Sequence, residues 1–351
     1  MKKILLSIVV LCCTVVAGAQ NSSQQQTAIL QTGDGDPTIF YGVDALKNAY
    51  NAAAQEGSVI TLTSGTFNSP NNIKKSVSIY GVGFEDNITE NVRKTNINGW
   101  LGFYADADGN VTRNSKLEGV YVNGNIDVNH SEYLTIAKCQ FSSLIMEGTG
   151  VDGLLVRQSY LTGGIDARNY YIGNMVIKNC YISGQIVNLT SDSQALFDHC
   201  ILRHYSGSDT NYAHAAAFYT NCIINNHDRY NEDPPIETGY TTENCIFFTN
   251  EGNVKKRDGE RVNNKYAVDF STLFGDGVNN IDYSTARTFV LATPGDYPGT
   301  DGTPVGVTGG DYPWYKVPSI PYVKNLNATV NGTSLDVNYD AGVGSTNPPT
   351  E

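Results

Sequence analysis

The stretches Ile136-Ala-Lys-Cys-Gln-Phe141, Ile177-Lys-Asn-Cys-Tyr-Ile182 and Phe197-Asp-His-Cys-Ile-Leu202 share one pattern: an apolar residue, a polar residue before a cysteine, and a second apolar residue. The same pattern fits four further segments, LEGVYV (117–122), VRQSYL (156–161), YTNCII (219–224) and TENCIF (242–247). The position of the cysteine, which we call the Cys column, is filled by Val120, Cys139, Ser159, Cys180, Cys200, Cys222 and Cys245. A repeat this regular must be explained before any other feature of the chain.

The residue just before the Cys column is polar or glycine in every segment. We call this series the corner column: Gly119, Lys138, Gln158, Asn179, His199, Asn221 and Asn244. Asparagine and glycine tolerate the left-handed backbone conformation that a tight bend needs. Each segment therefore predicts a strand, a one-residue corner and a second strand.

A third apolar series follows the two strands and predicts a third short strand in each repeat; its members are Ile126, Ile145, Ile165 and Ile186. Three strands and three turns in about twenty residues form one coil of a parallel β-helix, in which stacked coils about 4.8 Å apart bury one another's apolar side chains. A β-sandwich is the alternative, but its hairpins would not repeat one residue set at fixed spacing. The predicted fold class is all-β, a parallel β-helix.

The five cysteines of the repeat are predicted to be free thiols. Their number is odd, and the column also accepts Ser159 and Val120. Neighbouring coils also hold equivalent Cβ atoms farther apart than the ~3.8 Å that a disulfide prefers. No Cys or His spacing typical of a zinc site occurs.

The N-terminus is typical of a secretion signal. Lys2 and Lys3 precede an apolar run over 4–16, too short to span a bilayer, and Ala17-Gly-Ala19 fits a cleavage site before Gln20. We predict a signal peptide over 1–19, a chain without a membrane span, and a location outside the cytoplasm: secreted, on the cell surface or in the periplasm. Without Lys2 and Lys3, 21 basic residues face 35 acidic ones, a net charge of -14 that disfavours nucleic acid as a partner.

Residues before the repeat predict a cap for the open end of the β-helix. Val43 to Gln55 has the periodicity of a short helix, with Leu46, Ala49, Tyr50 and Ala53 on one face. Alternating strands are predicted over 58–67 and 77–81. An uncovered β-helix end would expose unpaired strands, so the helix is expected to cover the N-terminal mouth.

These features resemble the pectate-lyase-like, right-handed parallel β-helix superfamily. The resemblance rests on the helix followed by Gly57 to Phe67 and Val77 to Gly83, on the Ile-x-Asn-Cys-x-Ile coils, and on Gly299 to Gly310, which is similar to the closing segment of secreted bacterial members. It covers roughly residues 33–316 and implies the right-handed sense. It also implies polysaccharide lyases, glycoside hydrolases and non-catalytic surface proteins as relatives, so it does not settle the function.

The domain organisation follows. Residues 20–316 are predicted to form the β-helix domain with its N-terminal cap. Residues 317–351 are predicted to form a linker, a β-hairpin and a tail. Two alternating strands lie around Asn331-Gly332, a strong signal for a two-residue hairpin turn.

Calcium is the one cofactor that the resemblance raises, and the sequence supports it weakly. Asp127 and Asp166 are expected to point outward two coils apart, near 10 Å, with Met146 between them and Val187 next. That separation is too large for both to ligate one ion. Asp106-Ala-Asp-Gly-Asn110 begins like a calcium loop but lacks the later acidic ligand, which favours a turn. The paired aspartates, Gly-His-Gly and Arg-x-Lys of polygalacturonase-like hydrolases are absent from the sequence.

A polar loop cluster between Arg203 and Tyr240 is the candidate substrate site, because long loops on a regular scaffold often carry function. Tyrosine rings can stack on sugars, and arginine or histidine can meet acidic sugars. His227, Asp228 and Arg229 offer acid–base groups. The predicted site residues are Arg203, His204, Tyr212, His214, His227, Asp228, Arg229 and Tyr230, against the alternative that this loop merely covers the coils.

Two functions remain open at this point. The first is a secreted protein that binds or processes extracellular polysaccharide; as an enzyme it would be a polysaccharide lyase or a glycoside hydrolase. The second is a non-catalytic structural or adhesive surface protein, in which the β-helix is a rigid spacer and the C-terminal hairpin docks a partner.

Overall fold

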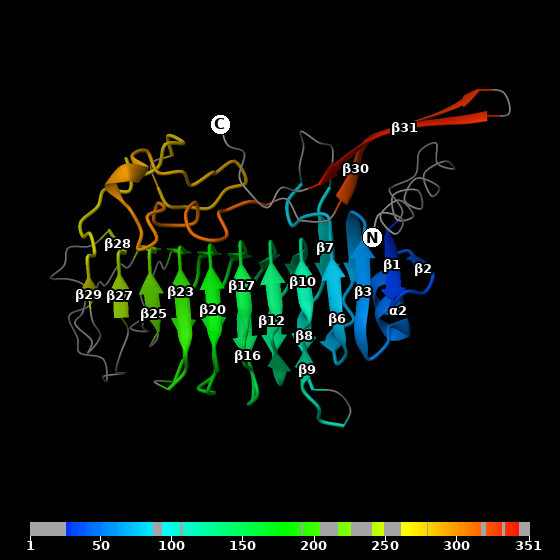
Figure 1. Cartoon of the computed structure of the whole chain (residues 1–351), viewed down its shortest axis with the longest axis horizontal. Coiled ribbons are helices and arrows are strands. Elements are labelled where there is room, and N and C mark those ends of the chain that lie inside the picture. Colours follow the sequence, from blue (N-terminus) through cyan, green and yellow to red (C-terminus); the bar gives the residue numbers. More distant parts are fainter. Residues whose placement is uncertain are drawn as a thin grey trace.

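The computed structural model describes residues 26–86, 93–105, 108–190, 192–203, 217–225, 241–248, 261–278 and 280–316, and the backbone of two strands, 321–331 and 334–343. Its central feature is a parallel β-solenoid, in which short strands stack along the long axis of the molecule (Figure 1). The predicted all-β parallel β-helix is confirmed.

Three sheets form the solenoid, and sheet C has fewer described strands than sheets A and B. Sheet A contains, in spatial order, β2 (Thr38–Tyr41), β1 (Thr27–Thr32), β3 (Glu56–Leu62), β6 (Ser76–Tyr80), β10 (Lys116–Glu118), β14 (Thr135–Ala137), β17 (Leu155–Arg157), β20 (Met175–Lys178), β23 (Ala195–Asp198), β25 (Phe218–Thr220), β27 (Thr241–Glu243) and β29 (Arg261–Val262). Sheet B contains β4 (Gly65–Asn68), β7 (Thr95–Asn98), β11 (Tyr121–Asn123), β15 (Gln140–Phe141), β18 (Tyr160–Leu161), β21 (Tyr181–Ile182), β24 (Ile201–Leu202), β26 (Ile223–Ile224) and β28 (Ile246–Phe247). Sheet C contains β5 (Asn72–Ile73), β8 (Leu101–Phe103), β12 (Ile126–Val128), β16 (Leu144–Met146), β19 (Ile165–Asp166) and β22 (Ile186–Val187).

The Cys column lies in the interior, as predicted. All seven of its members are at most 1% exposed, and the five cysteines are free thiols. The column also has one member that the sequence analysis missed: Asn264, which follows β29 and whose Oδ1 accepts the backbone N–H of Cys245 at 2.8 Å. An asparagine therefore closes the column at its C-terminal end.

The corner column adopts the left-handed conformation that its composition predicts. Its seven members and Asn263 in the next coil all have φ between 50° and 72°. Sheets A and B meet at this bend, so the chain turns from one sheet to the other through a single residue in each coil.

The third apolar series differs from the prediction at one coil. Ile126 pairs with Leu144, and Leu144 with Ile165, so Leu144 and not Ile145 points into the core. Ile145 pairs with Asp127 and Asp166 on the outer face, while Met146 is buried. The prediction failed here because all three residues of β16 are apolar, and alternation alone cannot say which of them points inward.

The N-terminal cap consists of a helix and an antiparallel strand pair. Helix α2 (Ala45–Ala52) confirms the predicted capping helix with tighter bounds, and it buries Leu46, Ala49 and Tyr50. Strand β1 pairs antiparallel with both β2 and β3, an extension of sheet A that the sequence analysis did not predict. The first coil is thereby covered.

Two further strand pairs lie outside the three sheets. Strands β9 (Thr112–Arg113) and β13 (Ser131–Glu132) are parallel, and β30 (Pro321–Asn331) and β31 (Ser334–Val343) form an antiparallel hairpin in which Asn331 pairs with Ser334. A 3-10 turn, η2, covers Pro294–Asp296. Within the described ranges, no helix has the length and apolar character that crossing a membrane requires.

Candidate functional site

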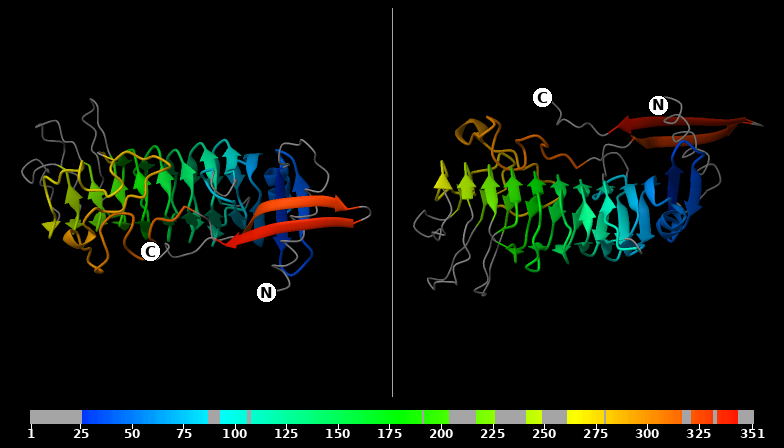
Figure 2. Two further views of the ribbon diagram at one scale, coloured as in Figure 1. Left: turned by 90° about the horizontal axis from the view of Figure 1, so that it is seen from above. Right: turned by 60° about the horizontal axis from the view of Figure 1, so that its bottom comes forward.

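Sheet B is covered on its outside by the chain that follows the last coil. Apolar side chains between Val268 and Trp314 form a second apolar cluster against the outward side chains of Tyr181, Ile201, Ile223 and Ile246. The covering segment runs back along the solenoid (Figure 2). The sequence carried a signal for this cover, because the later strands of sheet B, β21, β24, β26 and β28, have two apolar residues in a row, as in Ile223-Ile224, where one face should be polar. The outer face of sheet B is therefore a buried interface in its later coils.

The end of the covering segment, residues 297–316, is here called the strap. It crosses the corner column coil by coil and accepts or donates hydrogen bonds there. The contacts are Asn221 Nδ2 to Thr300 Oγ1 (3.1 Å), His199 Nε2 with Thr303 Oγ1 (3.2 Å), Asn179 Nδ2 to Val307 O (3.0 Å) and Gly309 O (2.6 Å), and Gln158 Nε2 to Pro313 O (2.6 Å). The polar corner residues are thus anchors for the strap as well as bend formers.

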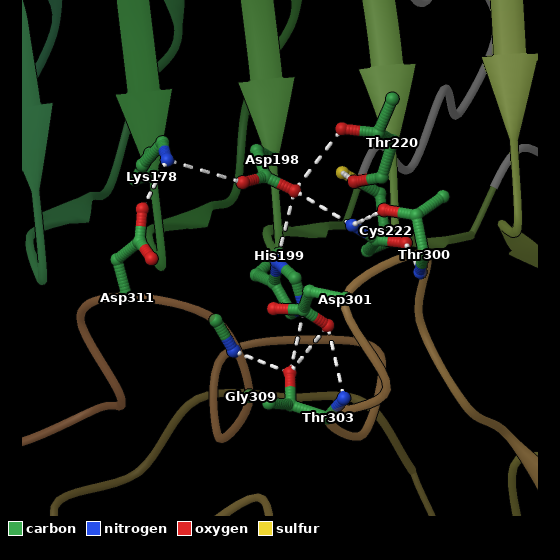
Figure 3. Close-up of polar contacts among 12 residues, drawn as sticks. Lys178, Asp198, His199, Thr220, Cys222, Thr300, Asp301, Thr303, Gly309 and Asp311 are labelled. Atoms are coloured by element: carbon green, nitrogen blue, oxygen red, sulfur yellow. Dashed lines mark hydrogen bonds and ion pairs between the residues drawn. The ribbon is translucent and has the colours of Figure 1, made fainter.

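A triad-like chain of contacts occurs under the strap (Figure 3). His199 Nδ1 lies 2.8 Å from Asp198 Oδ1, and Thr303 Oγ1 lies 3.2 Å from His199 Nε2 and 2.8 Å from Asp301 Oδ1. His199 is 1% exposed, and the Thr303 hydroxyl also accepts the backbone N–H of Gly310. A hydroxyl held on three sides beside a buried imidazole cannot reach a substrate, so this network fixes the strap.

Asp198 is the electrostatic centre of that network. Burial alone would raise its pKa, but hydrogen bonds from His199, Asn221 and Thr220, together with the nearby imidazole, hold the pKa well below its usual range. Lys178 Nζ lies 3.5 Å from Asp198 Oδ2 and 2.7 Å from Asp311 Oδ2, and Asp311 belongs to the strap. The ionised carboxylate is therefore a structural anchor.

The outer face of sheet C carries a different arrangement, which we call the sheet C cluster: Trp100, Tyr104, Asp127, Glu147, Asp166 and Arg168. Its base is Gly102 in β8, where a Cβ atom would collide with the rings of both Trp100 and Tyr104. The two rings meet edge to face, 6.3 Å between centroids, and Trp100 is 37% exposed. Two aromatic rings therefore lie over bare backbone at this point.

Asp127 lies directly beside these rings, since it pairs with Gly102 across adjacent strands. Its Oδ1 is buried and has no hydrogen-bond partner among the described residues. Burial and the neighbouring Glu147 raise the pKa of Asp127, with Arg168 partly offsetting them. Burial, Asp127 and Glu147 likewise raise the pKa of Tyr104. The rings and the carboxylates therefore share one electrostatic environment.

Arg168 joins the remaining acids of the cluster. It pairs with Glu147, and its Nε lies 3.8 Å from Asp166 Oδ2. The other oxygen of Asp166 accepts Asn188 Nδ2 at 2.8 Å and the Arg168 backbone N–H at 2.9 Å. The Arg168 guanidinium thus occupies the position between these carboxylates where a cation would bind. The described part of the chain contains no group of three acidic, histidine or cysteine ligands suited to a metal ion.

The predicted loop site is described only at its first residue. Arg203 Nε donates to Asp282 Oδ1 at 2.5 Å, which ties the end of β24 to the covering segment. The other predicted residues, His204, Tyr212, His214, His227, Asp228, Arg229 and Tyr230, lie outside the described residues, so their role stays a prediction.

Comparisons with known proteins give no further guidance. No protein-family model, curated protein or solved structure matches this chain significantly.

Proposed function

We propose that this chain is a secreted protein that binds extracellular polysaccharide on the outer face of sheet C. The observation that carries the proposal is the pair of rings over Gly102 beside the half-buried carboxylate of Asp127. Sugars combine an apolar C–H face, which stacks on aromatic rings, with hydroxyl groups that donate to carboxylates. The sheet C cluster offers both kinds of contact on rigid strands.

Other faces of the solenoid are less suited to this role. Sheet B is covered in its later coils, and the corner column lies under the strap. Sheet A presents the half-exposed side chains of Leu155, Val176 and Leu196, which lack polar groups to orient a sugar, next to exposed Phe218. The sheet C cluster is a described surface where aromatic, acidic and basic groups converge beside exposed rings, the usual composition of a ligand site.

Catalysis would be an extension of this proposal. A carboxylic acid with a raised pKa is suited to donate a proton to a leaving oxygen, and Asp127 meets that requirement beside Glu147. The enzyme class would then be a glycoside hydrolase or a polysaccharide lyase. The proposal also includes the right-handed, pectate-lyase-like kinship, supported by the cap helix, the coils and the Gly299–Gly310 stretch, and secretion, supported by the signal sequence over 1–19.

The test compares Trp100→Ala and Tyr104→Ala with Phe218→Ala in affinity electrophoresis of the mature chain through gels that contain single polysaccharides. Phe218 is an exposed aromatic on sheet A, 57% exposed, and serves as the matched control. At least one polysaccharide is expected to retard the unmodified protein and the Phe218 variant. Both sheet C variants should lose the retardation. Equal retardation of all variants, or none with any polysaccharide, would refute the proposal.

An adhesive role is the second candidate, and the hairpin favours it. Strands β30 and β31 pair only with each other among the described strands, so both outer edges of the hairpin offer backbone groups to an added strand. Deleting residues 318–351 tests it: unchanged surface attachment of the truncated chain would argue against this role.

A further inference from the structure

The charges of the sheet C cluster bear on which polysaccharides it accepts. Three carboxylates, those of Asp127, Glu147 and Asp166, surround the single guanidinium of Arg168, which already contacts the latter two. A sugar carboxylate entering the cluster would meet a surplus of negative charge and a cation that is already paired. A neutral sugar meets no such repulsion, and its hydroxyl groups supply the hydrogens that carboxylates accept.

The direction of the bound chain follows from where the exposed rings lie. Trp100 precedes β8, and Tyr170 and Tyr171, 40% and 50% exposed, follow Arg168 in the turn after β19. Strand β19 stands three coils beyond β8 in sheet C. Three steps of about 4.8 Å separate the two groups of rings by roughly 14 Å along the solenoid axis. Because Trp100 lies before its sheet C strand and the two tyrosines lie after theirs, the line between the two groups also crosses the sheet. One coil step is close to the length of one sugar unit in an extended glycan.

From charge and spacing together, we infer that the ligand is a neutral, extended polysaccharide that crosses sheet C from coil to coil, from the Trp100–Tyr104 rings past Asp127 and Arg168 to the tyrosines after β19. This inference rests on the proposed function and specifies its substrate class. It also predicts a minimum length, because only an oligosaccharide of about four units reaches both groups of rings.

The experiment is isothermal titration of the full mature chain with two sets of probes. The first set compares neutral oligosaccharides from glucan, xylan, mannan and galactan with oligogalacturonate of equal length. At least one neutral series is expected to bind at least tenfold more tightly than oligogalacturonate. Tighter binding of oligogalacturonate would overturn the inference and leave the proposed function standing, whereas binding of neither would overturn both.

The second set varies the length of the neutral glycan that binds. Affinity is expected to rise at least tenfold from the disaccharide to the tetrasaccharide. The double variant Tyr170→Ala/Tyr171→Ala should abolish that gain, and Phe218→Ala should keep it. Equal affinity for all lengths, or an unchanged gain in the double tyrosine variant, would overturn this placement of the glycan. Glu147→Lys serves as a charge control: in this variant the affinity for oligogalacturonate is expected to come within tenfold of the affinity for the neutral oligosaccharide. An affinity for oligogalacturonate that does not change would count against the electrostatic argument.

Discussion

Replacing Asn179 by alanine tests how the strap is held. Asn179 is fully buried, has φ of 51°, and its amide donates to two strap carbonyls, Val307 O at 3.0 Å and Gly309 O at 2.6 Å. An alanine there adopts the left-handed conformation at a cost of about 1 kcal/mol. Losing two hydrogen bonds costs about 2 kcal/mol more. The Asn179→Ala variant should therefore lose about 3 kcal/mol.

Two control variants separate these contributions. Asn179→Gly tolerates the positive φ but still loses both hydrogen bonds, so it should lose about 2 kcal/mol. Asn263→Ala alters an exposed residue with φ of 53° on the last of these one-residue bends, so it should lose only the backbone contribution, about 1 kcal/mol.

Hydrogen exchange of the strap amides is the measurement that distinguishes a local from a global effect, because a solenoid need not unfold in a single step. The reporters are the backbone N–H groups of Gly306, which donates to Asn221 O at 2.8 Å, and Trp314, which donates to Val307 O at 2.7 Å. Both Asn179 variants should lower their protection by roughly thirtyfold, the equivalent of 2 kcal/mol. Strap protection that stays at the wild-type level in both variants would refute the reasoning.

Three further predictions concern the interior and its ionisable groups. Leu144→Lys should abolish folding while Ile145→Lys is tolerated, as circular dichroism of the two purified variants will show, because only Leu144 points into the core and Ile145 lies between two aspartates on the outer face. Burial lowers the pKa of Lys138 to about 8, so the unfolded chain binds the proton more tightly than the folded chain does. The free energy of unfolding, measured in urea, should therefore rise from pH 8 to pH 10. A flat profile in wild type, or the same rise in Lys138→Met, would contradict this. Burial raises the pKa of Cys139 to about 12. All five thiols of the Cys column are buried and should react with a thiol reagent only after denaturation. Prompt reaction of the folded chain, or fewer than five reactive thiols after denaturation, would count against the stacked interior.

The repeat made the interior of the solenoid predictable. Apolar residues at fixed spacing can be satisfied only by stacking, and the corner column had a composition that only a left-handed bend explains, as Asn179 and His199 now show. The register of β16 was not predictable in the same way, since Leu144, Ile145 and Met146 are equally apolar and the choice between them depends on contacts with neighbouring coils.

The covering segment and the sheet C cluster were harder to predict, because long-range contacts between irregular segments decide them. The contact of Asn179 with Gly309 joins residues 130 positions apart in the sequence, and no local pattern in the strap predicts it. Asp127 and Asp166 could be placed on one face by alternation. Alternation could not place Trp100 on that face. The stretch Trp100-Leu-Gly-Phe-Tyr104 nevertheless has a glycine between two aromatic residues, which is a usable signal for rings folded over bare backbone.

The most direct test of the central claim is a crystal structure of the mature chain with a neutral tetrasaccharide that binds in titration. Sugar rings are expected above sheet C, one of them on Trp100, with the glycan running from coil to coil. A tetrasaccharide bound instead over the loop residues 204–216 and 226–240, or beside Phe218 on sheet A, would contradict it.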